Sequence, residues 1–316
     1  MEHQVVVLNA GKMNYDGALD FQTLSKNVTV YEDSAPEEIV PRVGNAPCIV
    51  TKELALTKEQ IAAFPDSLKL IVEAGTGYNN IPIDAAGERG ITVCNVPAYS
   101  TQRVAHTALM LMLNLASTMQ TQIGMLKAGN HDNFTARLMV PHIELNGKTL
   151  GIVGAGNIGV ALMNIALAME MNILVHTRTP REDRERVRFV PLATLLKESD
   201  FISLHCPLTD ATRHIIDANA LAAMKPTAFL VNTSRGALID EPALIRALQE
   251  RRIAGAGLDV QETEPPAADN PLYSLENVIL TPHMGWKGKE TRERLLRVVR
   301  DDIAGFFAGK PVNVVT

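Results

Sequence analysis

The chain has 316 residues, which suggests two domains at about 150 residues each. Its composition, 46% hydrophobic and 21% charged, is ordinary for a soluble globular protein, and its net charge of −5 argues against a general nucleic-acid binder. Three scattered cysteines exclude a disulfide scaffold and a Cys-rich zinc module, and we predict no metal site. The longest apolar run, 108–113, is too short for a membrane span, and no secretory signal is visible. We therefore expect a cytoplasmic protein with no membrane or nucleic-acid partner.

The first part of the chain alternates short apolar runs with helical patterns. The runs predict strands at 5–8, 48–50, 70–72 and 91–94, with helices at 57–64 and 84–89 between them. One long helix is then expected over 101–127. Because it is apolar on most faces around 105–116, this helix should be buried.

A second alternating series begins at Thr149. It predicts six strands, at 150–153, 173–176, 201–204, 228–232, 257–260 and 278–280, and helices at 158–169, 218–223 and 241–250. Strands that alternate with helices imply parallel sheets covered on both faces. A last helix, about 289–307, follows this series and is expected to pack on the first lobe.

The predicted fold is therefore α/β, with two doubly wound parallel-sheet lobes. A Rossmann nucleotide-binding domain, residues 99–287, is inserted into a flavodoxin-like substrate domain formed by residues 1–98 and 288–316.

A glycine-rich turn joins the first strand of the second series to its helix. Gly154, Gly156 and Gly159 have G-x-G-x-x-G spacing, directly after a strand and at the start of a helix, which is the context of a dinucleotide fingerprint. Asn157 and Ile158 fall at the helix N-terminus, where free N–H groups bind a pyrophosphate. The alternative is a turn that needs its glycines for conformation alone.

The residues after the next strand bear on the choice of nucleotide. An acid there binds the ribose hydroxyls of NAD, but this position is Thr177, followed by Arg178, Thr179 and Arg181. Arginine binds a 2′-phosphate in a bidentate manner, so we predict that NADPH is preferred over NADH. The alternative is that these arginines are simply solvated.

Three polar residues follow the last three predicted strands: Arg235 after FLVNTS, Glu264 after GAGLDVQET and His283 after NVILTP. Ligands bind at this edge of an open α/β sheet. Arginine suits a carboxylate, histidine transfers a proton near neutral pH, and a neighbouring glutamate would raise the histidine pKa. Each residue alone has a structural alternative: a surface ion pair, a solvated loop acid or a packed histidine.

Several stretches together resemble the D-isomer-specific 2-hydroxyacid dehydrogenase family, and its glyoxylate and hydroxypyruvate reductases in particular. They are KLIVEAGTGYNNIPIDAAGERGITVCNVP, GKTLGIVGAGNIG, SLHCPLTDATRHII, NTSRGALIDEPALIRAL, AGLDVQETEPP and LTPHMGW. The resemblance implies hydride transfer between a nicotinamide and a 2-oxo acid. It also implies His283 as the acid/base, Glu264 as its partner and Arg235 as the substrate anchor.

The resemblance assigns further residues. It implies that backbone N–H groups at Thr76 and Gly77 bind the substrate carboxylate, and that Asp259 contacts the nicotinamide amide. Cys206 and Pro207 match a turn beside the dinucleotide, and Thr233 and Gly285 are expected at the same site. The family also implies a homodimer formed through the arm at about 100–145.

Some positions depart from the family pattern. Thr177 replaces the acid of NAD-using members, the segment KAGNHDNF lacks a common tryptophan, and no regulatory domain is expected after residue 316. We expect His106 to pack between helices, while Trp286 is either a feature of the glycerate and hydroxypyruvate group or a core aromatic.

The leading hypothesis is an NADPH-preferring reductase of a small 2-oxo acid, such as glyoxylate or hydroxypyruvate, that yields the D-2-hydroxy acid. The alternatives are an NAD-linked D-lactate, phenylpyruvate or phosphoglycerate dehydrogenase, and a nucleotide-sensing corepressor on the same fold. A phosphorylated substrate ranks low because AGTGYNN supplies no basic residue.

Overall fold

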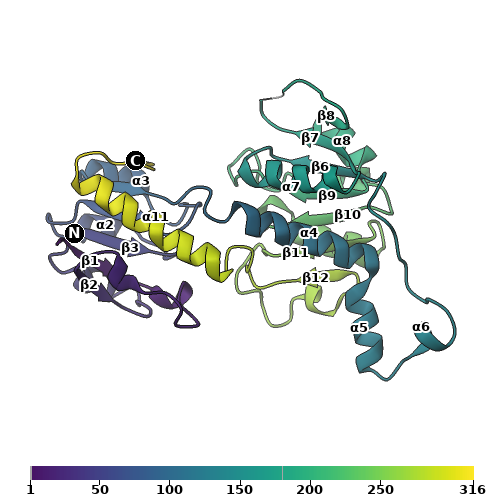
Figure 1. Ribbon diagram of the computed structural model, residues 1–316, viewed down its shortest axis with the longest axis horizontal. Coiled ribbons are helices and arrows are strands. Elements are labelled where there is room, and N and C mark those ends of the chain that lie inside the picture. The colour runs from purple at the N-terminus through teal and green to yellow at the C-terminus, as the bar shows by residue number, and fades with distance from the viewer. Residues whose placement is uncertain (1, 180) are drawn as a thin grey trace. The chain divides into compact units, whose positions relative to one another are not determined.

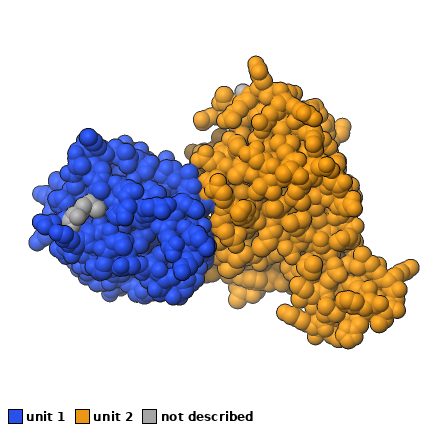
Figure 2. Space-filling model, in the orientation of Figure 1, with its two compact units in different colours: residues 1–100, 286–316 blue, residues 101–285 orange. Residues whose placement is uncertain are grey.

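A computed structural model describes residues 2–179 and 181–316 (Figure 1). The chain divides into two compact units (Figure 2). Unit 1 comprises Met1–Ser100 and Trp286–Thr316, and unit 2 comprises Thr101–Gly285. Unit 2 is therefore inserted into unit 1, and the chain passes between them at 100–101 and at 285–286.

Unit 1 contains a five-stranded parallel sheet in the order β2-β1-β3-β4-β5. Its strands are β1 (Gln4–Val7), β2 (Asn27–Val30), β3 (Cys48–Thr51), β4 (Leu70–Glu73) and β5 (Thr92–Cys94). This is the doubly wound order of flavodoxin-like folds. The flavodoxin-like prediction for this lobe is thus confirmed.

Alternating side chains in these strands build two separate cores. Val5 and Val7 face the side covered by α11 (Lys289–Phe307), while Val6 and Leu8 face the other side. That other side is covered by α1 (Ile39–Val43), α2 (Lys58–Ala63) and α3 (Ile83–Glu88). The carboxyl ends of β3 and β4, which carry polar residues, are thereby held on a buried scaffold.

Unit 2 contains a seven-stranded parallel sheet in the order β12-β11-β10-β9-β6-β7-β8. Its strands are β6 (Thr149–Val153), β7 (Asn172–His176), β8 (Val187–Phe189), β9 (Phe201–Leu204), β10 (Phe229–Asn232), β11 (Gly255–Leu258) and β12 (Val278–Leu280). Counted from β6, the order is that of a Rossmann sheet with one extra strand at the β12 edge. The order in which strands are added to the sheet reverses between β6 and β9, and the glycine turn lies at this switch point.

Helices cover both faces of this sheet (Figure 1). One face carries α4 (Thr101–Ser117) and α7 (Asn157–Ala168), and the other carries α8 (Leu192–Glu198), α9 (Ala218–Ala223) and α10 (Glu241–Gln249). Gly257 in β11 allows α4 to lie close, because an added Cβ would sit 2.9 Å from the Cβ of Leu111.

The element predictions need several corrections, and helices α1 and α8 were not expected. Strands β2 and β8 were not expected; both are edge strands with few buried side chains, so their hydrophobic pattern is weak. Strand β11 begins and ends two residues earlier than predicted. The expected helix over 101–127 is two helices, since Thr118 (φ +48°) interrupts it, and His106 is exposed rather than packed.

An arm of unit 2 follows this interruption. Helix α5 (Met119–Lys127) continues away from the sheet, and the chain returns through α6 (Asp132–Thr135) (Figure 1). None of the helices in the described part of the chain is long and apolar enough to cross a membrane.

Candidate active site

The glycine turn after β6 is shaped by close backbone approaches. Gly154 has φ +103°, and an added Cβ would lie 2.6 Å from the amide nitrogen of Cys206. A Cβ on Gly159 would overlap the carbonyl oxygen of Gly154, whereas one on Gly156 would have nothing within 4 Å. The first and third glycines therefore pack the turn, and the second faces open space.

This open space fits a dinucleotide pyrophosphate. Gly156 is the N-cap of α7 and supplies no capping side chain, and both Gly156 and Asn157 are exposed. The N–H groups of the first turn, including that of Ile158, are thus available to an anion at the positive end of a twelve-residue helix.

The neighbouring turn after β9 is tied to the turn after β10. The carbonyl oxygen of Cys206 accepts a hydrogen bond from Ser234 Oγ at 2.8 Å, and Pro207 beyond it is exposed. Thr233 is buried, and its hydroxyl has no hydrogen-bond partner among the described residues. A bound nucleotide would supply such a partner. Burial also lowers the pKa of His205 to about 4, and its Nε2 lies 2.8 Å from Ser203 Oγ.

Asp259, at the end of β11, holds the segment that follows β12. It is 1% exposed, and its Oδ1 accepts hydrogen bonds from Thr281 Oγ1 (2.5 Å) and Met284 N (2.9 Å). Its Oδ2 accepts one from Gly285 N at 2.8 Å. The main chain on both sides of His283 is thereby fixed.

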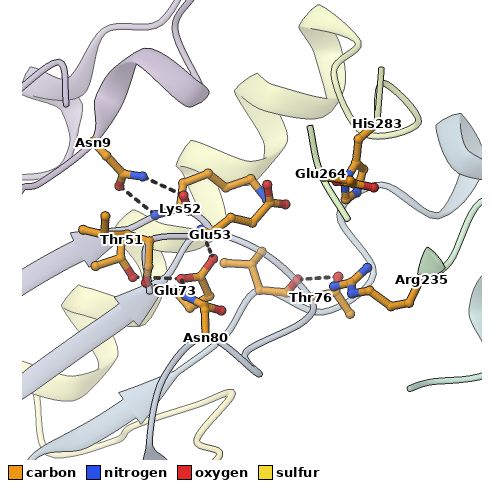
Figure 3. A network of polar contacts seen from close by, with 12 residues as sticks. Asn9, Thr51, Lys52, Glu53, Glu73, Thr76, Asn80, Arg235, Glu264 and His283 are labelled. Atoms are coloured by element: carbon orange, nitrogen blue, oxygen red, sulfur yellow. Dashed lines mark hydrogen bonds and ion pairs between the residues drawn. The ribbon is translucent and has the colours of Figure 1, made fainter. Parts of the chain in front are cut away.

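Glu264 and His283 are in direct contact (Figure 3). His283 Nδ1 lies 2.8 Å from Glu264 Oε2, and Glu264 Oε1 accepts a hydrogen bond from Gln261 N at 3.1 Å. His283 has φ +47°, and its backbone N–H donates to the carbonyl oxygens of Asp259 and Thr281. Its Nε2 makes no hydrogen bond to a described residue, so that nitrogen is available for proton transfer.

Arg235 follows β10 on a loop that touches the Glu264 loop. Buried Asn232 shapes this loop, because its Nδ2 donates to Arg235 O at 2.8 Å and its Oδ1 accepts from Ser234 N at 3.0 Å. A Cβ on Gly236 would overlap the carbonyl group of Gln261. Glycine at 236 thus lets the segments carrying Arg235 and Glu264 lie in van der Waals contact.

In unit 1, the loop after β4 presents two backbone N–H groups. The carbonyl oxygen of Gly75 accepts from Val96 N at 2.8 Å, and that of Thr76 accepts from Asn95 Nδ2 at 2.7 Å. In a trans peptide the N–H points opposite to the C=O, so the N–H groups of Thr76 and Gly77 point away from Asn95 and Val96. Neither donates to a described residue. This geometry suits a carboxylate.

The residues after β7 lie at the surface. Thr177 is half-buried, and Arg178 and Thr179 are exposed with no hydrogen bond or ion pair to any residue in the described part of the chain. Position 177 therefore brings no carboxylate to the end of β7.

Sequence reasoning missed the residues that hold the loops: Asn95, Asn232, Gly236 and Thr281. All four stand within the motif stretches quoted above, and Asn232 and Gly236 directly adjoin the selected residues Thr233 and Arg235. Their position within those motifs was the signal that could have identified them. Trp286, left open by the sequence, is a core aromatic of unit 1 at 5% exposure.

Comparison with known proteins identifies the family. A profile described as "D-isomer specific 2-hydroxyacid dehydrogenase, NAD binding domain" matches residues 109–285. The chain belongs to this family of oxidoreductases.

Among its relatives, a hydroxypyruvate reductase of Blautia hydrogenotrophica is 36% identical over 99% of both chains. A glyoxylate reductase of Korarchaeum cryptofilum is 39% identical over 90% of this chain and 88% of its own. A D-3-phosphoglycerate dehydrogenase of Methanocaldococcus jannaschii is 40% identical over 87% of this chain but only 52% of its own.

Solved structures agree with this membership. The NADPH-dependent glyoxylate/hydroxypyruvate reductase of Sinorhizobium meliloti, in complex with NADP and malonate, superposes with a TM-score of 0.86. It is 28% identical, and the match covers 100% of this chain and 97% of that one.

Proposed function

We propose that this chain reduces a small 2-oxo acid, of the glyoxylate or hydroxypyruvate type, to the D-2-hydroxy acid with NADPH. The observation that carries the proposal is the 2.8 Å contact of His283 with Glu264 at the sheet edge that also bears the glycine turn. Relatives named glyoxylate and hydroxypyruvate reductase support this substrate class.

In the proposed reaction a nicotinamide held at the glycine turn would supply the hydride that the carbonyl carbon accepts. His283 donates a proton from Nε2 to the carbonyl oxygen, which completes the hydroxyl group. Glu264 orients the imidazole through Nδ1 and stabilises the positive charge that it carries before transfer. Arg235 binds the carboxylate and polarises the carbonyl, and the N–H groups of Thr76 and Gly77 bind the carboxylate oxygens.

The preference for NADPH rests on the residues after β7. Thr177 has no charge to repel a 2′-phosphate, and Arg178 is free of a described partner. A hydrogen bond to a charged group contributes about 1.5–3 kcal/mol, so Arg178→Ala should weaken NADPH use roughly tenfold or more and leave NADH use nearly unchanged. Thr177→Asp should favour NADH.

The test is the ratio of kcat/KM for NADPH and NADH, measured at one ionic strength because salt screens such contacts. Arg300→Ala, at an exposed arginine of α11, is the matched control and should leave the ratio unchanged. A wild-type preference for NADH that Arg178→Ala does not alter would refute the proposed cofactor.

The substrate is tested with purified protein, both cofactors and a panel of glyoxylate, hydroxypyruvate, pyruvate, phenylpyruvate and 3-phosphohydroxypyruvate. Absorbance of the reduced nicotinamide follows turnover, and chiral analysis of the product identifies the D-isomer. Highest kcat/KM for pyruvate, phenylpyruvate or the phosphorylated acid would favour a dehydrogenase of that substrate. Nucleotide binding without turnover would favour a corepressor.

We further propose a homodimer formed through the α5–α6 arm. Apolar side chains are exposed there, including Met119, Ile123, Leu126 and Phe134, the last at 78% exposure. An exposed apolar cluster of this kind is typical of a protein interface, and a second copy of the chain is the proposed partner. Light scattering after gel filtration should give twice the monomer mass, and a monomer at micromolar concentration would overturn the proposal.

A further inference from the structure

Unit 1 contains a buried cation that the proposed reaction does not use (Figure 3). Lys52 follows β3 and is 2% exposed. Its Nζ forms an ion pair with Glu53 Oε1 at 2.7 Å and lies 4.1 Å from the centre of the Trp286 ring. A fully buried lysine is rare unless it is paired, so this position calls for an explanation.

A second carboxylate lies beside this pair. Glu73, at the end of β4, is fully buried and accepts hydrogen bonds from Thr51 Oγ1 (2.8 Å), Asn80 Nδ2 (3.0 Å) and Glu53 N (2.8 Å). Burial raises the pKa of Glu73, while the positive charge of Lys52 opposes that rise. One ammonium group thus lies beside two carboxylates of different exposure.

The cluster lies against the loop that presents the free N–H groups. A Cβ on Gly75 would sit 3.1 Å from Lys52 Nζ and 3.2 Å from Glu73 Oε1. Gly75 directly precedes Thr76 and Gly77. The charges therefore adjoin the loop whose peptide groups are proposed to bind the substrate carboxylate.

We propose that Lys52 and Glu53 set the electrostatic potential of the carboxylate-binding loop and so determine how strongly the enzyme binds anionic substrates. Lys52 is a positioning residue, since it acts through the loop. Removing its ammonium would make the cluster more negative by one charge, which disfavours a carboxylate at the loop. This inference rests on the proposed function of Thr76 and Gly77.

Two substitutions change the cluster by one charge in opposite directions. Lys52→Met keeps the length of the buried stem and makes the cluster more negative, whereas Glu53→Gln makes it more positive. A unit charge several ångströms from an anion near the protein surface changes its binding constant by roughly tenfold. We expect Lys52→Met to raise the KM for the 2-oxo acid about tenfold. Glu53→Gln should lower it by about threefold, because its side chain is 34% exposed and partly screened.

The charge of the ligand provides a readout that a merely structural role would not change. Oxamate and oxalate have similar shapes but carry one and two negative charges. Lys52→Met should weaken inhibition by oxalate by a larger factor than inhibition by oxamate, with the KM for NADPH unchanged. Lys58→Met, at an exposed lysine of α2, is the matched control and should change none of these constants.

Equal loss of oxamate and oxalate binding in Lys52→Met, or a higher KM in Glu53→Gln, would overturn the inference. If Lys52→Met does not fold, the sign of the change in Glu53→Gln decides alone. Failure of the wild-type protein to reduce any 2-oxo acid with either cofactor would instead refute the proposed function.

Discussion

Gly236 offers a sharp test of how the site is assembled. A Cβ at this position would overlap the carbonyl carbon and oxygen of Gln261, which are backbone atoms and have no rotamer to change. Non-bonded carbon atoms prefer a separation of about 3.5 Å, so Gly236→Ala must move the two segments apart by more than about 1 Å. Arg235 precedes one contact residue, and Glu264 lies three residues beyond the other.

This displacement should act on the reaction more than on nucleotide binding. Misplacing a catalytic group by about 1 Å costs roughly 100-fold in rate. Gly236→Ala should therefore lower kcat about 100-fold, while the dissociation constant of the nucleotide, measured by its fluorescence, changes little, since the glycine turn after β6 is untouched. Gly87→Ala in α3 is the control, because a Cβ there meets nothing within 4 Å.

The control substitution Gly87→Ala also has an expected effect on thermal stability. Alanine is favoured over glycine inside a helix by about 1 kcal/mol, so Gly87→Ala should raise Tm and leave kcat unchanged. A Gly236→Ala variant with an unchanged Tm and a kcat within twofold of wild type would show that the close approach at Gly236 does not hold the site together.

Three further predictions concern single side chains. His283→Ala should lower kcat by about 10²–10⁴ with nucleotide affinity retained, and near-normal turnover would remove His283 from the role of proton donor. Arg235→Lys keeps the charge but loses the planar fork, so KM should rise and kcat should fall together; a change in nucleotide affinity alone would assign Arg235 to the nucleotide site. His205 has its pKa lowered from 6.5 to about 4, so the folded state holds it neutral while the unfolded chain takes up a proton. Protonation of the unfolded chain should therefore lower the free energy of unfolding by about 3 kcal/mol as pH falls from 6.5 to 4. In denaturant unfolding, the free energy of unfolding of His205→Gln should fall less steeply with decreasing pH than that of the wild type.

The central strands could be predicted because their residues are buried on both faces. Val5 to Leu8 is a continuous apolar run, and Phe201 to Leu204 is apolar except for Ser203; such runs indicate parallel strands under helices. The edge strands β2 and β8 were not predicted, because only one of their seven side chains is fully buried. The helix break at Thr118 could not be predicted either, because the residue with positive φ there is a threonine and no glycine or proline marks the position.

Some residues of the candidate site could likewise be predicted from local sequence patterns, and others could not. Gly154, Gly156 and Gly159 were readable because a dinucleotide turn fixes their spacing and its context. Lys52 was not, because its burial depends on Trp286, which lies more than two hundred residues away in the chain. Contacts between such distant segments leave no local periodicity, and a lysine after a strand looks like a surface residue.

Asp259 has a structural role that is compatible with the one that the family resemblance implies. The family resemblance implies a contact with the nicotinamide amide, yet the structure has this carboxylate accept three hydrogen bonds from 281–285. Each carboxylate oxygen accepts about two hydrogen bonds; Oδ1 already accepts two of these three, and Oδ2 accepts only the one from Gly285 N. Oδ2 therefore keeps capacity for an amide donor while it fixes the chain after His283. The same carboxylate can thus fix the chain on both sides of His283 and still accept a hydrogen bond from the amide of the proposed nicotinamide.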